Sequence, residues 1–458
     1  MNQSEQILGT EPIGKLLIKY SVPAIIGMVV NGLYNVVDRI FIGNIPGVGP
    51  LAIAGVGVTM PIMTIILAFG MLIGIGTVTS VSIKLGQGKK EEAEKLIGNA
   101  IALSVIIGLI ISVVGLLFGD QILQSFGASP ESLEYAKAYI NIILMGCIFN
   151  IIAFVMNCSI RGDGNPKLAA IIMIVGCGTN IILDALFIFG LNMGIQGAAL
   201  ATVISQILTA IWGLAYYMKG KSNLKFAKSS LRLEKKLVKE IVAIGCAPFA
   251  MQIAASLIQV ISNNALRVHG GDLGIAAMAT ITSIAMMLLM PIGGLTQGAQ
   301  PIIGYNYGAE KYDRATKTFN ICLLIATIAL GIAWVFIQTF PEAVVSLFSS
   351  DPELVNITVN GLKKYLVVLF LVGIPYMGAN YMQSIGKAKE AMLLSLLRQV
   401  IILIPIVLIL PNFMGLDGVW FAQPIADIIA TVVTVIVVKR EFKSYKKLIN
   451  NQKEQVQI

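Results

Sequence analysis

Two aspartates in strongly apolar surroundings are the residues of this sequence with the greatest capacity for chemistry. Asp184 is the only charged side chain between Leu168 and Tyr216, and Asp38 occupies a similar apolar segment, although Arg39 follows it directly. A carboxylate inside an apolar segment is costly unless it is paired, protonated or bound to a cation. The sequence therefore predicts that these two carboxylates carry the chemistry of the protein.

Polar side chains accompany both aspartates at helical spacing. Asn180 precedes Asp184 by four residues, and Asn31 and Asn35 precede Asp38 by seven and three, so each set shares one helix face. Polar residues within membrane spans normally face the bundle interior. A polar pocket is therefore expected in the N-terminal half, and four apolar segments contribute to it: Asn31, Tyr34, Asn35 and Asp38; Asn150 and Asn157; Asn180 and Asp184; and Thr202, Ser205 and Gln206.

The oxygen atoms of this set suit a hard cation. Carboxylate, amide and hydroxyl oxygens are the ligands that such ions prefer, which points to Na⁺. A buried carboxylate can equally carry a proton. A third reading is a hydrogen-bonded network that only holds helices together, which is common for single polar residues such as Asn31, Asn150, Ser205 and Gln206. The sequence leaves these alternatives open.

The rest of the sequence is suited to lipid. Hydrophobic residues make up 56% of the chain and charged residues 12%, against about 25% charged in soluble domains. The apolar runs reach the roughly 20 residues that cross a bilayer, and their length favours helices over barrel strands. We expect an all-α polytopic membrane protein with twelve transmembrane helices, at about 15–42, 51–83, 96–118, 134–160, 168–189, 195–218, 237–266, 274–305, 316–340, 361–384, 390–411 and 417–438.

Basic residues gather on one side of the expected membrane. Of the 33 lysines and arginines, 27 fall in segments that share a side with the N-terminus. This asymmetry predicts that both termini are cytoplasmic. The net charge of +9 then reflects topology and contact with anionic lipid heads, and nucleic acid is not an expected partner.

The two halves of the sequence match each other at a shift of about 222 residues. Six spans in each half give both halves the same orientation, so the repeat is parallel, with an axis along the membrane normal, as in secondary transporters. The matching segments include Gly86–Lys90 with Gly308–Tyr312, Ser129–Glu131 with Asp351–Glu353, and Met193–Gly197 with Met414–Gly418. The expected units are an N-terminal lobe at 1–218, a cytoplasmic linker at 219–236, a C-terminal lobe at 237–440 and a cytoplasmic tail at 441–458.

The carboxylate pair is not repeated in the C-terminal half. Asn263 stands where the first half has Asp38, and Ile406 stands where it has Asp184. Arg398 and Asp427 lie near the middle of their spans instead. Opposite charges inside a membrane usually pair, so a structural ion pair is expected, with a gating or substrate role as the alternative. Flexible thioethers suit a promiscuous apolar surface, so Met60, Met63 and Met287 are candidates to line the cavity, with a role as core or lipid-facing filler as the alternative.

Other classes of site find little support. No Gly-x-x-x-x-Gly-Lys-Ser/Thr motif occurs, so coupling to an ion gradient is expected in place of ATP hydrolysis. The five cysteines lie within predicted spans without metal-ligand or disulfide spacing. We expect neither an enzyme nor a cofactor other than the coupling ion.

Several motifs resemble those of the multidrug and toxic compound extrusion (MATE) family, and the sequence is most similar to its MepA-like bacterial branch. The motifs are Met290–Ala309, Arg161–Pro166, Asn180–Gly190 followed by Met193–Ala201, and Gly14–Asp38 with Pro23. The resemblance covers nearly the whole chain.

The resemblance implies two six-helix lobes of the MATE/MOP type that export lipophilic organic cations in exchange for Na⁺ or H⁺ by a rocking motion. It implies a coupling-cation site at Asp38, Asn180, Asp184 and Thr202. The polar pattern of the spans itself gives the possible cavity or substrate residues Asn31, Tyr34, Asn35, Asn157 and Gln206. Some relatives also carry acids in spans seven and ten, where this chain has Gln252, Gln259, Asn263 and Gln383. A monomer in a bacterial cytoplasmic membrane is expected. A lipid-linked precursor flippase of the same superfamily and a receptor or channel without active transport remain alternatives.

Overall fold

The computed structural model describes residues 3–45, 48–126, 128–218, 222–225, 228–348 and 351–456. Helices dominate these residues, and no β-strand occurs among them. Parts of the expected linker (219–221, 226 and 227) and the last two residues of the expected tail lie outside the described residues.

The N-terminal half folds into long helices. In chain order they are α1 (Gln3–Thr10), α2 (Ile13–Gly43), α3 (Gly49–Gly86), α4 (Lys90–Ser125), α5 (Pro130–Gly162), α6 (Pro166–Asp184), the π-helical turn η1 (Ala185–Gly190), α7 (Gly194–Met218) and the short 3₁₀ turn η2 (Lys228–Leu231).

The C-terminal half is more segmented. Its elements are α8 (Lys235–Gly308), α9 (Tyr312–Thr339), α10 (Pro341–Val345), α11 (Pro352–Tyr365), η3 (Leu369–Leu371), α12 (Gly373–Ser384), α13 (Ala388–Leu396), the π-helical turn η4 (Leu397–Leu403), α14 (Ile404–Ile409), α15 (Pro411–Met414) and α16 (Leu416–Val456).

The described residues contain eleven helices that are long and apolar enough to cross a membrane. A twelfth span is the pair Pro352–Tyr365 and Leu369–Ser384, which bends by 43°. This arrangement confirms the prediction of a twelve-span all-α protein. The separate spans expected at 237–266 and 274–305 are joined almost directly within α8, because only Gly271 leaves the helical conformation, at φ 60° and ψ −158°. Glycine has no Cβ, so it adopts this positive φ without strain.

The sequence repeat is visible in how equivalent helices begin. The Ser129 hydroxyl accepts a hydrogen bond from the Ser132 amide at 3.1 Å, and Pro130 occupies the first turn of α5. In the second half, the Asp351 carboxylate accepts from the Glu353 amide at 2.9 Å, at the start of α11. A capping side chain followed by proline satisfies the free amides of a helix start. The repeated Ser-Pro-Glu and Asp-Pro-Glu sequences therefore encode the same helix boundary.

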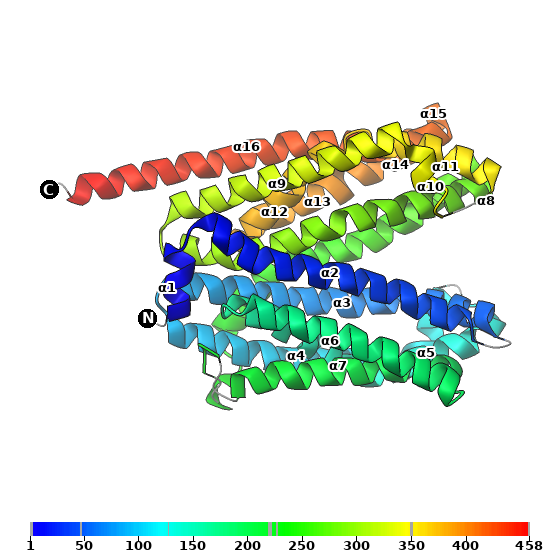
Figure 1. Ribbon diagram of the computed structural model, residues 1–458, viewed down its shortest axis with the longest axis horizontal. Helices are drawn as coiled ribbons and strands as arrows, with labels where there is room; N and C mark the ends of the chain where they lie inside the picture. The colour runs from blue at the N-terminus through cyan, green and yellow to red at the C-terminus, as the bar shows by residue number, and fades with distance from the viewer. Residues whose placement is uncertain are drawn as a thin grey trace.

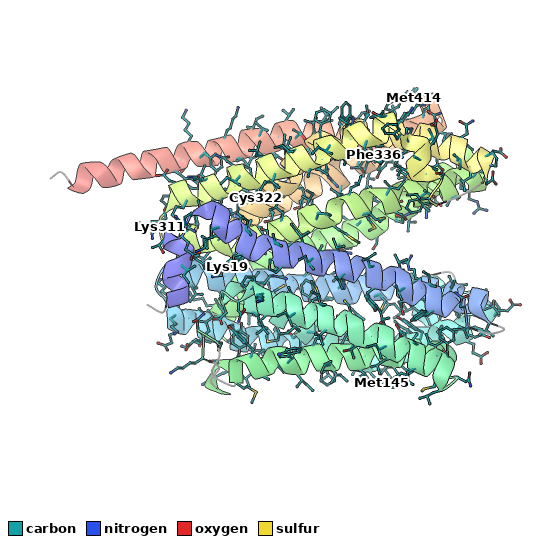
Figure 2. The ribbon with its side chains drawn as sticks, viewed as in Figure 1. Lys19, Met145, Lys311, Cys322, Phe336 and Met414 are labelled. Carbon is teal, nitrogen blue, oxygen red and sulfur yellow. The ribbon has the colours of Figure 1, made fainter. Side chains whose placement is uncertain are left out.

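The helices form two groups that lie together at one end and diverge toward the other (Figure 1). Helices α2 to α7 form one group and α8 to α16 the other, with α2 and α8 at the edges that face each other. Both termini lie at the end where the groups meet, which we call the terminal end. Lys19 and Lys311 lie toward this end in Figure 2. Met145, Phe336 and Met414 belong to the many exposed apolar side chains of the outer surface, as lipid contact requires.

Glycines hold the two groups together at the terminal end. A Cβ atom built on Gly86 of α3 would overlap the carbonyl oxygen of Tyr305 in α8, and one on Gly308 would overlap the carbonyl oxygen of Ile83. These two contacts are equivalent in the repeat, since Gly86 aligns with Gly308. Small residues allow helix backbones to approach closely in membranes. The closure at this end therefore depends on the absence of side chains.

We predict that Gly86→Ala or Gly308→Ala separates the lobes at the terminal end, because the added methyl group meets backbone that cannot rotate away. The loss of packing should lower stability by about 1–3 kcal/mol. Spin labels at the exposed positions Gln87 and Asp313 would report the separation by pulsed electron resonance. Gly57→Ala is the matched control, because α3 leaves open space at that position. If the distance between the labels stays the same in Gly86→Ala and in Gly308→Ala, the glycine contacts do not hold the lobes together at the terminal end.

Candidate functional site

Asp184 is fully buried at the last residue of α6, and its nearest partner lies one turn earlier. With the Asn180 amide oriented by its partners, its nitrogen donates to Asp184 Oδ2 at 2.8 Å and its oxygen accepts from the Thr202 backbone N–H at 3.0 Å. Thr202 lies on α7 and also is buried. Three of the four residues predicted for the cation site thus contact one another across α6 and α7.

Asp38 reaches the same place from α2. Its carboxyl group lies in contact with that of Asp184. One oxygen of each group, Oδ1, is buried without a hydrogen-bond partner among the described residues. The hydroxyl groups of Tyr34 and Tyr139 lie within hydrogen-bonding reach of Thr202 beside this pair.

Two carboxyl groups in contact in an apolar environment cannot both stay charged without compensation. Either a shared proton or a bound cation removes the repulsion. The unpartnered oxygens of Asp38 and Asp184, with the hydroxyl of Thr202 nearby, form an all-oxygen environment, which suits a hard cation such as Na⁺. The residues present therefore fit either a shared proton or a bound hard cation.

The helix carrying Asp184 changes its winding directly after this residue. The turn η1 is π-helical, with the Leu191 amide bonded to the Leu186 carbonyl at 2.9 Å. A π-turn inserts an extra residue into the helix and often accompanies functional sites. Nothing in the apolar sequence around Phe187 marks this turn, so the sequence analysis missed it.

A cavity of about 300 Å³, which we call the N-lobe cavity, has Asn180 and Thr202 among its lining residues. Four of the predicted substrate residues line it: Asn31, Tyr34, Asn157 and Gln206. Asp38 and Asp184 are not among its lining residues, whereas Asn180, which donates to Asp184, and Thr202 are. Residues that the sequence analysis missed include Met28, Phe154, Arg161, Met173 and Gln297.

The remaining predicted cavity residues lie elsewhere. The Asn35 amide donates to the backbone oxygen of Asn31 at 2.7 Å and does not line the N-lobe cavity. Met60, Met63 and Met287 line neither this cavity nor the two cavities of the C-terminal half described below, and Met60 and Met287 are exposed. Helical periodicity alone does not distinguish a side chain that faces a cavity from one that faces lipid.

Arg161 lies at the end of α5, buried at the edge of the N-lobe cavity. It donates from Nη1 to the Asn157 side-chain oxygen at 2.6 Å and from Nη2 to the Cys158 sulfur at 3.2 Å. Among the described residues it forms no ion pair within 4.0 Å of an acid. The sequence analysis did not predict Arg161 as a cavity residue, because it begins the polar Arg161–Pro166 motif at the end of a span.

Asp163 in the same turn holds the chain that follows α7. It accepts from the Tyr216 hydroxyl at 2.5 Å and from the backbone amides of Asn223 and Leu224 at 3.1 Å each. Burial raises the pKa of this carboxyl group from 3.8 to about 6, against the opposing effect of these hydrogen bonds. Asp163 therefore has a structural role: it anchors the segment after α7 to the Arg161–Pro166 turn.

A raised pKa in the folded state means that folding favours the protonated form of Asp163, so its contribution to stability is lost as pH rises from about 4 to about 6. Relative to Asp163→Asn, which does not titrate, the wild type should lose about 1–2 kcal/mol between pH 5 and pH 7. Thermal unfolding of both proteins at each pH measures this difference. An opposite trend, with the wild type gaining on the variant as pH rises, would show that the hydrogen bonds outweigh burial.

In the C-terminal half, Arg398 and Asp427 form an ion pair, with Nη1 and Oδ1 3.3 Å apart. The Gln423 amide also donates to Asp427 Oδ1 at 3.2 Å, and the Tyr365 hydroxyl donates to Gln423 at 3.4 Å. Arg398 lies in the second π-helical turn, η4. Each half therefore has buried charge on or directly beside a π-turn, acidic in the first half and an ion pair in the second.

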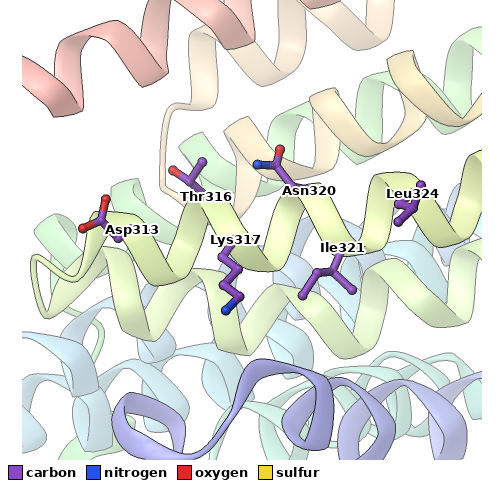
Figure 3. Close-up of a pocket in the computed structure, with 6 residues that line it drawn as sticks. All are labelled: Asp313, Thr316, Lys317, Asn320, Ile321 and Leu324. Carbon is purple, nitrogen blue, oxygen red and sulfur yellow. The ribbon is translucent and has the colours of Figure 1, made fainter.

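Another hollow lies on the outside of α9 and is not a candidate substrate site. Figure 3 shows its six lining residues along one face of that single helix, from Asp313 to Leu324. Asp313, Lys317, Asn320 and Leu324 are exposed. Residues from one helix face do not converge on a ligand from several sides, as a binding pocket requires.

The two repeated helical bundles, with buried polar sites inside them, define a multi-pass membrane transporter. The MatE family model matches residues 23–186 and 248–409, one segment in each half. The chain belongs to the MatE family. The resemblance noted from the motifs and the predicted fold are both confirmed.

Relatives extend over nearly the full chain. It is 29% identical to the multidrug export protein MepA of Staphylococcus haemolyticus over 93% of each chain, and 28% identical to MepA of Staphylococcus aureus over 93% of this chain and 94% of that one. Among solved structures, one described as the outward-facing conformation of a multidrug resistance MATE family transporter matches with a TM-score of 0.90 and 26% identity, covering 98% and 99% of the two chains. A MOP superfamily transporter from Pyrococcus furiosus, described as having a binding pocket of reverse polarity, matches with a TM-score of 0.91 and 26% identity over 97% and 99%.

Proposed function

We propose that this protein is a multidrug efflux antiporter that exports lipophilic, mostly cationic compounds in exchange for Na⁺ or H⁺. The contact between the carboxyl groups of Asp38 and Asp184 carries the proposal, because this pair requires a proton or a cation. The likeness to MepA multidrug export proteins supports export as the direction of transport and drugs as the class of substrate. In this proposal the protein works as a monomer in a bacterial cytoplasmic membrane and needs no cofactor besides the coupling ion.

The proposed orientation has the terminal end in the cytoplasm. The concentration of lysine and arginine in segments at that end supports it. The glycine contacts between α3 and α8 close this end, so the conformation described here corresponds to an outward-facing state. The likeness to a structure described as outward-facing agrees with this assignment.

The proposed coupling runs through α2. This helix carries Asp38 near one end, and nearer its other end it packs against the second half of α8, where the Ser21 hydroxyl donates to the Leu295 carbonyl at 3.3 Å. A Cβ atom on Gly298 would overlap Ser21, so the packing there is tight. A cation that binds Asp38 and Asp184 holds α2 against α6. Because α2 also forms part of the contact between the lobes, its position links ion binding to the rocking motion.

The N-lobe cavity has features suited to a lipophilic cation. Met28, Phe154 and Met173 offer thioether and aromatic surface, and Tyr34 offers a ring with a polar tip. Aromatic faces and sulfur atoms bind cations and aromatic groups of varied shape. The Asp38 and Asp184 pair supplies negative charge beside Asn180 and Thr202. When the coupling ion neutralises that charge, the cavity loses attraction for a cationic substrate, and release to the outside follows.

Replacing Asp184 by asparagine should abolish coupled export, because the amide retains the size of the side chain but neither titrates nor provides a formal charge. We expect ethidium efflux by Asp184→Asn to fall at least about tenfold in drug-sensitive cells. Asp313→Asn, which removes an exposed carboxylate on α9, is the matched control and should leave efflux unchanged. Normal ethidium efflux by Asp184→Asn would refute the proposed role of the carboxyl pair.

Thr202→Val separates the two candidate ions. The valine removes a hydroxyl oxygen beside the cation site while both carboxyl groups remain available to carry protons. If Na⁺ is the coupling ion, the Na⁺ concentration for half-maximal dye efflux from proteoliposomes should rise about tenfold, which corresponds to the loss of one ligand worth about 1.4 kcal/mol.

The matched control is Thr339→Val, an exposed threonine of α9. If a pH gradient drives efflux and Thr202→Val leaves the response to Na⁺ and to pH as in the wild type, the coupling ion is H⁺. Unchanged efflux under either imposed gradient, in wild type and variant alike, would exclude antiport altogether.

A further inference from the structure

Arg398 stands between two cavities of the C-terminal half. One cavity, of about 270 Å³, lies among α8, α11, η4 and α16, and we call it the C-lobe cavity. The other, of about 280 Å³, lies among α3, α8, α12, α13 and η4, and we call it the interlobe cavity because α3 belongs to the first half. Arg398 and its neighbour Gln399 line both.

The two cavities differ in charge. Asp427 lines the C-lobe cavity together with Arg398. In the interlobe cavity Arg398 is the one charged residue among the lining residues, and the others are apolar, aromatic, amide or hydroxyl side chains. The interlobe cavity therefore has a positive wall and no lining carboxylate.

The guanidinium group of Arg398 has unused donors. Its single close acidic contact is the 3.3 Å approach of Nη1 to Asp427 Oδ1, and within the described part of the chain it makes no hydrogen bond to a protein acceptor. Guanidinium carries five N–H donors and prefers two parallel bonds to a carboxylate or phosphate. The side chain is 19% exposed, so these donors have access to the cavities.

Two further polar atoms beside Arg398 lack partners. Gln383 Nε2 is a buried donor and Gln399 Oε1 a buried acceptor, each without a hydrogen-bond partner in the described residues. Both residues line the interlobe cavity, and Gln383 is 7% exposed. A buried amide without a partner is costly, so a ligand group that accepts from Gln383 and from Arg398 would satisfy both.

The interlobe cavity is adjacent to the N-lobe cavity. Gln297 of α8 lines both of them and donates to the Met28 sulfur at 3.1 Å. The walls include Met71, Met251 and Tyr376, which suit an apolar or aromatic body. A ligand can therefore place its apolar part toward Gln297 and an anionic group toward Arg398.

We propose that the interlobe cavity is an anion-recognition site in which Arg398 and Gln383 bind the carboxylate or phosphate oxygens of an amphiphilic ligand. Asp427 neutralises the guanidinium when the cavity holds no anion, which lowers the cost of burying it. A ligand anion then adds to the free donors of Arg398. This site extends the substrate range of the protein to zwitterions, because it lies apart from the acidic pair of the first half. It does not depend on which ion drives export.

The test compares two dyes that differ only at the anionic group. Rhodamine 110 has a free carboxylate, and rhodamine 123 is its methyl ester. Binding to the purified full-length protein is measured by fluorescence anisotropy. Arg398→Gln should weaken rhodamine 110 binding about tenfold, a typical effect of losing one charge-assisted contact, while the Kd for rhodamine 123 changes less than about twofold.

The control is Arg267→Gln, which removes an exposed arginine outside both cavities and should change neither Kd. Because Arg398→Gln leaves Asp427 without its partner, the double variant Arg398→Gln/Asp427→Asn serves if the single variant does not fold. Equal affinity for both dyes in the wild type, together with no change in either variant, would overturn the proposal.

A phospholipid phosphate offers the same oxygens as a carboxylate. Native mass spectrometry of the protein with added phosphatidylglycerol distinguishes this source. Lipid retained by the wild type and lost in Arg398→Gln, with no preference between the dyes, assigns the site to a lipid headgroup. Rhodamine 110 binding that depends on Arg398 and resists competition by phosphatidylglycerol assigns it to a small-molecule anion. If neither dye binding nor lipid retention depends on Arg398, the ion pair is purely structural.

Discussion

The contact between two carboxyl groups inside an apolar bundle is the constraint around which the N-terminal half is organised. Asp38 comes from α2 and Asp184 from α6, so the repulsion between two charges would separate these helices unless an ion or proton intervenes. Asn180 holds Asp184 in place by donating to one of its oxygens and leaves the other without a partner. The carboxyl pair therefore needs a proton or a cation because of how α2 and α6 are placed, and not because of one side chain alone.

Helix α2 carries Asp38 and also forms part of the contact between the two halves. Toward the terminal end α2 packs on α8 at Ser21 and Ile25, where Gly298 and Gly294 leave no room for side chains. Because few side chains interdigitate between α2 and α8 at these glycines, the two helices can shift slightly as rigid bodies without repacking large side chains. A shift of α2 is therefore transmitted to α8 directly, and α8 carries both spans that begin the C-terminal half.

Patterns along the chain predicted the features that depend on local chemistry. The twelve spans follow from hydropathy, the repeat from motifs such as Ser-Pro-Glu, and the shared face of Asn180 and Asp184 from helical spacing. The family resemblance added Thr202 to their site. Features that depend on packing did not follow. The π-turns η1 and η4 each insert a residue into a helix, and no residue type or spacing in Ala185–Gly190 or Leu397–Leu403 marks the insertion. Arg161 lines a cavity and Met287 is exposed because of how their helices are rotated about their axes. The pattern of polar and apolar residues along a helix does not determine this rotation.

The two halves share a backbone plan but differ in the sign of their buried charge. Ile406, the repeat equivalent of Asp184, lies in α14 beyond η4, whereas Arg398 lies within η4. A duplicated carboxyl pair would have required a second proton or cation in the C-terminal half. The Arg398 and Asp427 pair is close to neutral by itself, so that half needs no ion for charge balance and can remain unchanged while the N-terminal half gains or loses one. Under the proposed antiport, only the N-terminal lobe contains an unbalanced carboxyl pair that an ion must neutralise, so ion binding acts on one lobe and not on the other. In the proposed cycle, this difference between the halves, and not the duplication itself, determines which lobe responds to the ion.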